Sequence, residues 1–347
     1  MDLLIDTYGT KIGATGERIA LTFPNVKEKK EYPIHRIDKI LILRAGSLST
    51  DAAKLALDHD VDIVYLGSFG KPIGRLFSSE PKGLAGLRRA QLEISNSEKS
   101  LEIAKILVKG KCTNQISYIR SLGHAHKKDF SREILQMESI LKTIEPLPNI
   151  EKSKEQLLGI EGYTAERYFS CLKKLHTFSG RKPEARDKFN SALNYGYGML
   201  YNEVDRACLY TGLDPNMGLY HSERYGKPAL VLDLVEEFRV PIVDSVVFPL
   251  FLEKKITQKG CFDKTGPGEY QLSQKGKKFL IEAVVNRLNE SVVWNGDGKR
   301  YSLKTVIENQ VRGMARHFMG KEEKYIPFDM AEMLQLRPEV LAKNSHE

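Results

Sequence analysis

Residues able to hold a metal ion are concentrated in the second half of the chain. His221 is followed by Asp233 and Glu236 within the segment 218–238, and Glu161 lies in a separate helical segment. An Asp and a Glu three positions apart are neighbours on a helix and repel each other unless a cation lies between them. One imidazole with several carboxylates suits Mn²⁺ or Mg²⁺ better than Zn²⁺, because hard oxygen donors dominate and no thiolate takes part.

Glu161 is unusual because of the helix that carries it. At about 100° per residue, this helix has an apolar face, and Glu161 falls in the middle of it. The face consists of Leu158, Ala165, Tyr168, Phe169 and Leu172. A carboxylate turned towards a core is costly unless a cation or strong donors meet it. The helix alone leaves two interpretations open: a buried glutamate paired with an arginine or capped by a backbone amide, and a metal ligand.

The acids after His221 fall on one side of a short predicted helix. Taken alone, this pattern is more typical of a solvated acidic face, and a single histidine is more often a packed residue than a ligand. The turn with Pro215 and Gly218 reverses the chain before His221 and can bring the imidazole against the acids. The acidic side holds Asp233, Glu236 and Glu237, and the apolar side holds Leu234, Val235 and Phe238.

The hydrophobic pattern changes near residue 85. Before it, short β-prone runs alternate with turns, as in an antiparallel sheet. One helix interrupts these runs, with Ser49 or Thr50 as its N-cap. The glycine-rich segment 9–17 lacks the Gly-Lys-Ser/Thr ending of a phosphate loop, so we predict a hairpin turn there.

The pattern after residue 85 is helical to the end of the chain. The polar segment 123–136 contains a His-x-His pair among lysines, and we interpret it as a solvated connection between helices rather than a metal site. The sequence therefore predicts an α+β protein with a β-rich domain at residues 1–85 and an α-helical domain at residues 86–347.

Composition narrows the class of protein. The formal net charge of the 347 residues is +8, which favours a polyanionic partner. The four cysteines are far apart without a CxxC pattern, so we expect reduced, buried thiols. The N-terminus does not resemble a signal peptide. The longest apolar run is too short to span a membrane, and we expect a cytoplasmic protein.

Several long segments carry a resemblance to a known family. These are LLGIEGYTAERYF, RDKFNSALNYGYGMLYNEV, GLDPNMGLYHSERYGKPALVLDLVEEFRVPIVDS and IENQVRGMARHFMGKEEKYIPF, with GKCTNQISYIRS and LRRAQ upstream. In this order they resemble the CRISPR-associated integrase of spacer acquisition, the universal first Cas protein, over nearly the whole chain.

The resemblance implies a fold and a set of site residues. The implied fold has an N-terminal β-sandwich that mediates homodimerisation and a larger all-α catalytic domain. The implied metal ligands are Glu161, His221 and Glu236, with Asp233 as a further catalytic residue that supports the metal or orients a ligand. Many relatives have aspartate at the position of Glu236, and we expect the longer side chain still to reach the ion.

The implied activity is that of a DNA integrase and endonuclease dependent on Mn²⁺ or Mg²⁺. It would insert captured double-stranded DNA into a CRISPR array through 3′-hydroxyl attack on the repeat, together with a small dimeric Cas partner protein. Two alternatives are a metal-dependent nuclease for branched DNA in repair or recombination and a non-catalytic DNA-binding scaffold. The candidate DNA contacts are Lys227, Arg224, Arg181 and Tyr201, whereas Arg239 is interpreted mainly as a partner of Glu236 or Asp244.

Overall fold

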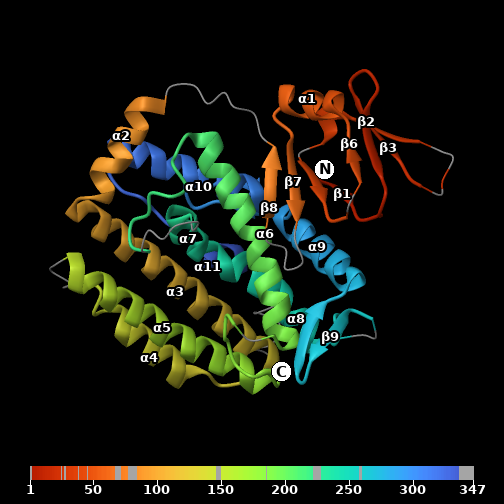
Figure 1. Cartoon of the computed structure of the whole chain (residues 1–347). Coiled ribbons are helices and arrows are strands. Elements are labelled where there is room, and N and C mark those ends of the chain that lie inside the picture. The colour runs from red at the N-terminus through yellow and green to blue at the C-terminus, as the bar shows by residue number, and fades with distance from the viewer. Residues whose placement is uncertain are drawn as a thin grey trace.

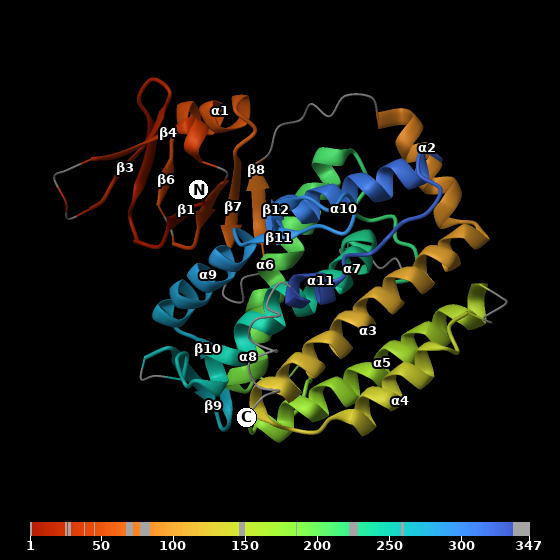
Figure 2. The same cartoon turned by 180° about the vertical axis from the view of Figure 1, so that it is seen from behind.

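Most of the strands lie at one end of the molecule and the long helices form the rest (Figure 1). The same division is seen from behind (Figure 2). The computed structural model describes residues 2–24, 26, 29–37, 39–44, 46–66, 72–76, 84–145, 150–184, 186–221, 228–257 and 260–335.

Two four-stranded sheets form the strand-rich end. The first sheet has the order β1 (Asp2–Ile5), β5 (Lys39–Ile42), β7 (Asp62–Leu66) and β8 (Pro72–Leu76). The second has the order β4 (Lys30–Pro33), β3 (Arg18–Thr22), β2 (Lys11–Ala14) and β6 (Ser47–Leu48). The expected antiparallel pairing is wrong for β1, β5 and β7, which are parallel. The chain visits the second sheet or helix α1 (Thr50–Asp58) between these strands, and such crossovers return it in the same direction.

One apolar core joins the two sheets and α1. Ile40 and Ile63 from the first sheet, Ile19 from the second and Ala52 from α1 are all fully buried in it. The predicted cap is confirmed, since the Ser49 side chain accepts a hydrogen bond from the Ala52 amide at 3.1 Å. The predicted hairpin is confirmed as well, because β2 and β3 are antiparallel neighbours.

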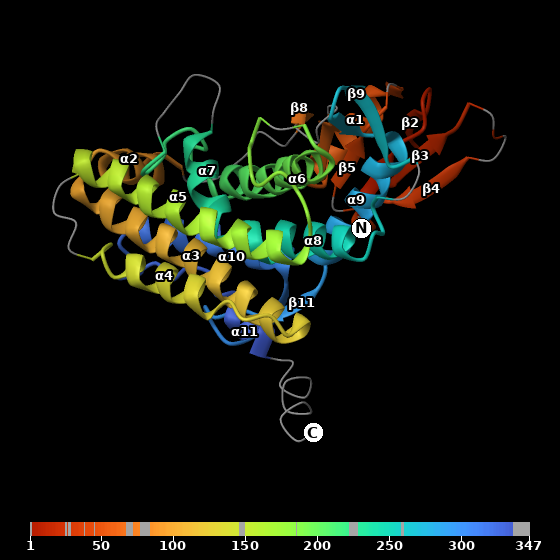
Figure 3. The same cartoon turned by 90° about the horizontal axis from the view of Figure 1, so that it is seen from below.

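Helices α3, α4 and α5 run side by side, and α6 lies between them and the strands (Figures 1 to 3). The helices are α2 (Leu84–Ser95), α3 (Glu98–His126), α4 (Ser131–Leu141), α5 (Ile150–Leu175), α6 (Lys188–Thr211), α7 (Ala229–Val235), α8 (Ser245–Leu252), α9 (Gln274–Leu288), α10 (Leu303–Phe318) and α11 (Met330–Gln335). Short 3-10 turns are η1 (Ile34–Arg36) and η2 (Glu236–Phe238), and η3 (Arg239–Asp244) is a π-helix. No helix among the described residues is long and apolar enough to cross a bilayer.

The larger part of the chain is not all-α. Two antiparallel hairpins interrupt its helices: β9 (Phe262–Gly266) with β10 (Glu269–Leu272), and β11 (Ser291–Val293) with β12 (Arg300–Ser302). Gly268 has a φ of +74° at the first hairpin turn, a conformation that glycine adopts without strain. The predicted connection at 123–136 is mostly helical, since α3 continues through His126 and α4 begins at Ser131. The four cysteines are free and buried, as predicted.

Charged side chains fix the strands against α6. Lys39 of β5 forms an ion pair with Glu203 of α6, and both are almost fully buried. Arg75 of β8 donates to Asp205 of α6 at 3.0 Å. Buried charges are stable only when paired, so these contacts place α6 accurately relative to the first sheet.

The substitution Glu203→Ala is expected to lower the free energy of unfolding by about 3–5 kcal/mol, because the buried ammonium of Lys39 loses this counter-charge. Denaturant-induced unfolding measures the change. Glu253→Ala is the matched control, since Glu253 pairs with Lys255 at the surface, and its cost should stay below about 1 kcal/mol. Equal costs for the two substitutions would contradict the role of the buried pair.

Candidate active site

Helices α3 and α5 and the turn η2 meet around one ammonium group. The Nζ atom of Lys111 on α3 lies 2.5 Å from Glu161 Oε1 of α5 and 2.5 Å from Glu236 Oε2 of η2. Lys111 is 7% exposed and Glu236 only 1%. Two carboxylates that are far apart in the sequence are therefore held together by one buried cation.

Arg239 holds the other oxygen of Glu236. Its guanidinium lies 2.8 Å from Glu236 Oε1 and donates to the Tyr201 hydroxyl at 2.9 Å. Burial by itself would raise the pKa of Glu236, but the positive charges of Arg239 and Lys111 outweigh it and hold that pKa below its usual value. The expected pairing of Arg239 with Glu236 is confirmed, and Glu236 is ionised between two cations.

The acidic segment changes its helical winding within a few residues. Helix α7 ends at Val235, and the next residues form first the 3-10 turn η2 and then the π-helix η3. The predicted constant α-helical period is therefore wrong here, and Asp233, Glu236 and Glu237 point to different partners. All three are buried, so the solvated acidic face is also wrong. Pro241 within η3 has no amide hydrogen to continue an α-helical ladder.

Glu237 anchors η2 to the segment that follows α10. Its carboxylate accepts hydrogen bonds from the Tyr325 hydroxyl at 2.5 Å and the Phe328 amide at 2.6 Å. Asn114 of α3 donates to the backbone carbonyls of Glu237 and Phe328 at 2.8 and 2.9 Å. Burial raises the pKa of Glu237 to about 7 although these bonds favour its ionised form. The backbone of Glu236 is thus fixed through its neighbour.

Asp233 positions His221. Its carboxylate accepts the backbone amides of Leu219 at 2.5 Å and His221 at 3.0 Å, and it lies 2.7 Å from the imidazole Nδ1 of His221. Burial favours the neutral imidazole, but the hydrogen bond to Asp233 and the charges of Asp233, Glu236 and Glu161 raise the pKa of His221 overall. Asp233 thus contacts both the backbone and the imidazole of His221, and its catalytic role stays a prediction.

Gln91 of α2 fixes the turn before His221. Its fully buried amide donates to the carbonyls of Asp214 and Met217 at 2.9 and 3.1 Å and accepts the Asp214 amide at 2.9 Å. The loop that carries His221 is therefore held at one end by Gln91 and at the other by Asp233.

The predicted ligands form two adjacent pairs, Glu161 with Glu236 and His221 with Asp233. No three His, Cys, Asp or Glu side chains in the described ranges are already placed to hold a metal. The donor set still fits a divalent ion, because Glu161 Oε2 is buried without a hydrogen-bond partner among the described residues and a cation already bridges the two glutamates. With Nδ1 engaged by Asp233, His221 can bind an ion only through Nε2.

The candidate DNA contacts have different surroundings. Arg181 is half exposed. It donates a hydrogen bond to Asn190 Oδ1 at 3.0 Å, and its guanidinium lies 5.3 Å from the centre of the Tyr197 ring. Tyr201 accepts the hydrogen bond from Arg239 described above. Lys227 and Arg224 lie outside the described residues.

The hydrophobic pattern and the motifs do not identify three further residues of the site, which are Lys111, Gln91 and Asn114. Each is a polar side chain buried on a helix, and a lysine on an apolar helix face requires a carboxylate partner just as Glu161 requires a cation. That signal is present in the segment GKCTNQ.

Among the apolar residues expected beside Glu161, Tyr168, Phe169 and Leu172 are buried, whereas Leu158 is 43% exposed because it lies at the edge of the buried face.

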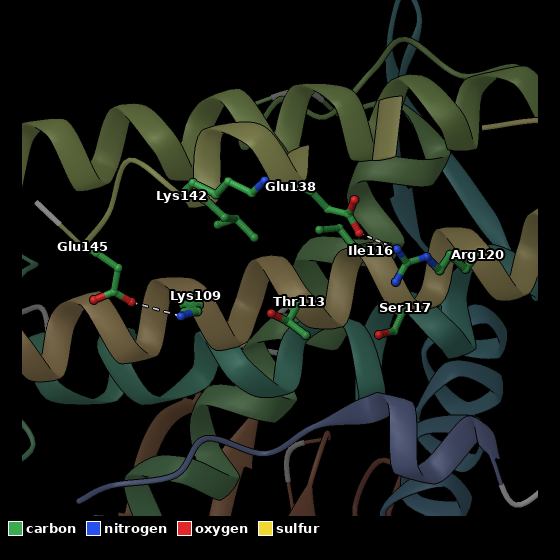
Figure 4. A pocket seen from close by; sticks show the side chains of 9 residues that line it. Lys109, Thr113, Ile116, Ser117, Arg120, Glu138, Lys142 and Glu145 are labelled. Atoms are coloured by element: carbon green, nitrogen blue, oxygen red, sulfur yellow. Dashed lines mark hydrogen bonds and ion pairs between the residues drawn. The ribbon is translucent and has the colours of Figure 1, made fainter. Parts of the chain in front are cut away.

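A separate hollow of about 400 Å³ lies between α3 and α4 (Figure 4). In it Lys109 pairs with Glu145 at 3.0 Å and Arg120 pairs with Glu138, so its main charges are matched internally. Lys111, Glu161 and Glu236 do not line this hollow. The cluster around Lys111 is therefore the candidate site rather than this hollow.

Comparisons with known proteins agree on one family. The model of the family described as "CRISPR associated protein Cas1" matches residues 3–286. The chain is 31% identical to the CRISPR-associated endonuclease Cas1 1 of Archaeoglobus fulgidus, over 94% of this chain and 99% of that protein.

Two solved structures are similar to the fold. A casposase bound to its integration product has a TM-score of 0.81 and 28% identity, covering 95% of this chain and 94% of that one. A Cas6-RT-Cas1–Cas2 complex has a TM-score of 0.75 and 17% identity, covering 95% of this chain and 36% of that one.

Replacing Gln91 with Met is expected to lower the free energy of unfolding by about 2–4 kcal/mol, because an amide and two carbonyls of the 214–217 turn lose a buried partner. The loop that carries His221 also loses one of its two supports. The matched control is Gln136→Met at a half-buried position of α4. Unchanged stability of the Gln91 variant would show that the turn does not depend on this side chain.

Proposed function

Because the chain belongs to the Cas1 family of CRISPR-associated proteins, we propose that it is a DNA integrase and endonuclease that inserts captured DNA fragments into a CRISPR array. The observation that carries the proposal is the buried meeting of Glu161 and Glu236 beside His221, at the positions that the family motifs mark. The similarity to a casposase bound to its integration product supports strand joining over simple cleavage of branched DNA.

Glu161, Glu236 and Nε2 of His221 are the proposed ligands of a divalent ion, Mn²⁺ or Mg²⁺. When bound, such an ion polarises a phosphoryl oxygen and stabilises the charge that develops in an in-line displacement. Arg239 fixes the direction of the Glu236 carboxylate, and Asp233 fixes the orientation and tautomer of His221. Glu237 and Asn114 hold the backbone beneath Glu236.

In the proposed joining reaction the 3′-hydroxyl oxygen of the captured DNA forms a bond to the repeat phosphorus. The bond from that phosphorus to the 3′ oxygen of the repeat strand breaks, and the hydroxyl proton passes to solvent while the leaving oxygen is protonated. If water attacks in place of the hydroxyl, the same displacement yields cleavage. No covalent bond to the protein is needed, so one site supports both activities.

The partners we propose are double-stranded DNA, a second copy of the chain and a small dimeric Cas protein. The net charge of +8 favours DNA, and a solved structure similar in fold is a Cas6-RT-Cas1–Cas2 complex. We assign homodimerisation to the N-terminal β-sandwich of residues 1–85 and catalysis to residues 86–347. Arg181, Arg224, Lys227 and Tyr201 are proposed DNA contacts.

Loss of any proposed ligand is expected to reduce joining of a 3′-hydroxyl DNA end to a repeat-containing plasmid by roughly a hundredfold or more. Suitable variants are Glu161→Ala, His221→Ala and Glu236→Gln. Glutamine is chosen at 236 because alanine would remove a polar partner from each of two buried cations. The assay follows Mn²⁺-dependent joining and DNA affinity in parallel.

DNA affinity should change little in these variants, because phosphate contacts rather than the ion ligands dominate binding. Glu166→Ala on the exposed face of the same helix is the control and should join DNA normally. Normal joining by one of the three ligand variants would remove that residue from the proposed site.

Arg181→Ala is expected to weaken DNA binding at low salt and to reduce the slope of log K against log salt by about 0.9, the value for one lost phosphate contact. The measurement is a salt titration of binding by fluorescence anisotropy. Arg186→Ala serves as a control, because Arg186 is exposed and faces Glu269 at 3.5 Å. An unchanged slope would show that Arg181 does not contact a phosphate and only supports Asn190.

A further inference from the structure

Lys111 lies between the two glutamates that are proposed as ligands of the ion. Its Nζ is in contact with Glu161 Oε1 and Glu236 Oε2 at the same distance of 2.5 Å. We propose that Lys111 is a built-in counter-ion that holds the site together in the metal-free protein and must be displaced when the divalent ion binds. The inference rests on the proposed function, because it assumes the same ligands for the ion.

Electrostatics explains why a cation is needed before any metal arrives. Glu236 is almost fully buried, Glu161 has a side chain only 15% exposed, and both face one point. Two carboxylates that face the same point repel each other strongly in a medium of low polarity. The Lys111 ammonium lies between the two carboxylates and neutralises part of this negative charge.

Geometry makes the lysine and a metal ion competitors. The ammonium uses one oxygen of each glutamate, and Arg239 uses the second oxygen of Glu236 at 2.8 Å. An ion that binds both glutamates can use Glu161 Oε2, which has no hydrogen-bond partner among the described residues, but at Glu236 it must take the oxygen that Lys111 now holds. The lysine can withdraw because its charge is carried on a flexible four-carbon side chain, whereas Arg239 is held in addition by Tyr201 and the ring of Tyr197.

The competition predicts a metal-dependent stability that an ordinary structural lysine would not show. Without metal, removal of the ammonium leaves two buried carboxylates in mutual repulsion and destabilises the protein. With metal, the ion supplies the missing charge, and no lysine has to be displaced. A lysine that only packed against α5 would give the same loss of stability under both conditions.

Lys111→Met tests the proposal, because methionine keeps an unbranched side chain of similar length without the charge. Lys105→Met is the matched control, since Lys105 is another largely buried lysine of α3 that pairs with Glu102 at 2.8 Å and lies outside the ion pairs of the site. Binding of Mn²⁺ to full-length protein is measured by calorimetry without DNA. Thermal unfolding is measured once with a chelator and once with saturating Mn²⁺.

For Lys111→Met we expect Mn²⁺ to bind about tenfold more tightly than to the unmodified protein. In chelator the melting temperature should fall by about 5 °C or more, and saturating Mn²⁺ should remove that deficit. Lys105→Met should leave the affinity for Mn²⁺ unchanged and show the same melting deficit in both conditions.

Two results would overturn the inference, and they can be told apart. Equal Mn²⁺ affinity in the unmodified protein and Lys111→Met, with equal melting deficits in both conditions, would overturn the role of Lys111 and leave the proposed function intact. Absence of Mn²⁺ binding in both proteins would overturn the proposed ligand set together with this inference. Glu161→Ala provides the reference for a lost site.

Discussion

The structure depends on pairing buried carboxylates with positive charges. Glu161 and Glu236 come from separate elements and meet in the interior, where an unpaired carboxylate is unstable. Lys111 and Arg239 supply the compensating charge, and α3, α5 and η2 must therefore stay in register with one another. The same requirement appears on α6, where Glu203 pairs with Lys39 and connects the helix to a strand. Charge pairing thus fixes both the site and its position relative to the sheets.

Much of the fold could be predicted from the sequence because local patterns determine it. The strands β1, β3, β5 and β7, the capped helix after Ser49 and the long amphipathic helices follow from hydrophobic period and turn chemistry. The pairing direction of β1, β5 and β7 could not be predicted in this way, because it depends on where the chain travels between strands. The hairpins β9–β10 and β11–β12 are too short to give a clear period.

The site was predicted only in part. Glu161, His221 and Glu236 were selected by residue type and family motif, and the structure places their side chains in one region. Their partners could not be inferred from one helix at a time, because Lys111 and Gln91 act across gaps of many residues. Constant α-helical geometry after Val235 was the main physical error. A tight 3-10 turn followed by a wide π turn sends consecutive acids to different neighbours.

The link between Glu237 and the segment 325–328 has a consequence for the time course of synthesis. The backbone amide of Phe328 and the carboxylate of Glu237 are separated by 91 positions. A ribosome therefore produces every proposed ligand well before it produces the residues that hold η2 in place. Domains made earlier fold first during translation, so a nascent chain has the acids of a nuclease before it has their final geometry. The contacts that complete the geometry of η2 therefore form only after residues 325–328 have been made.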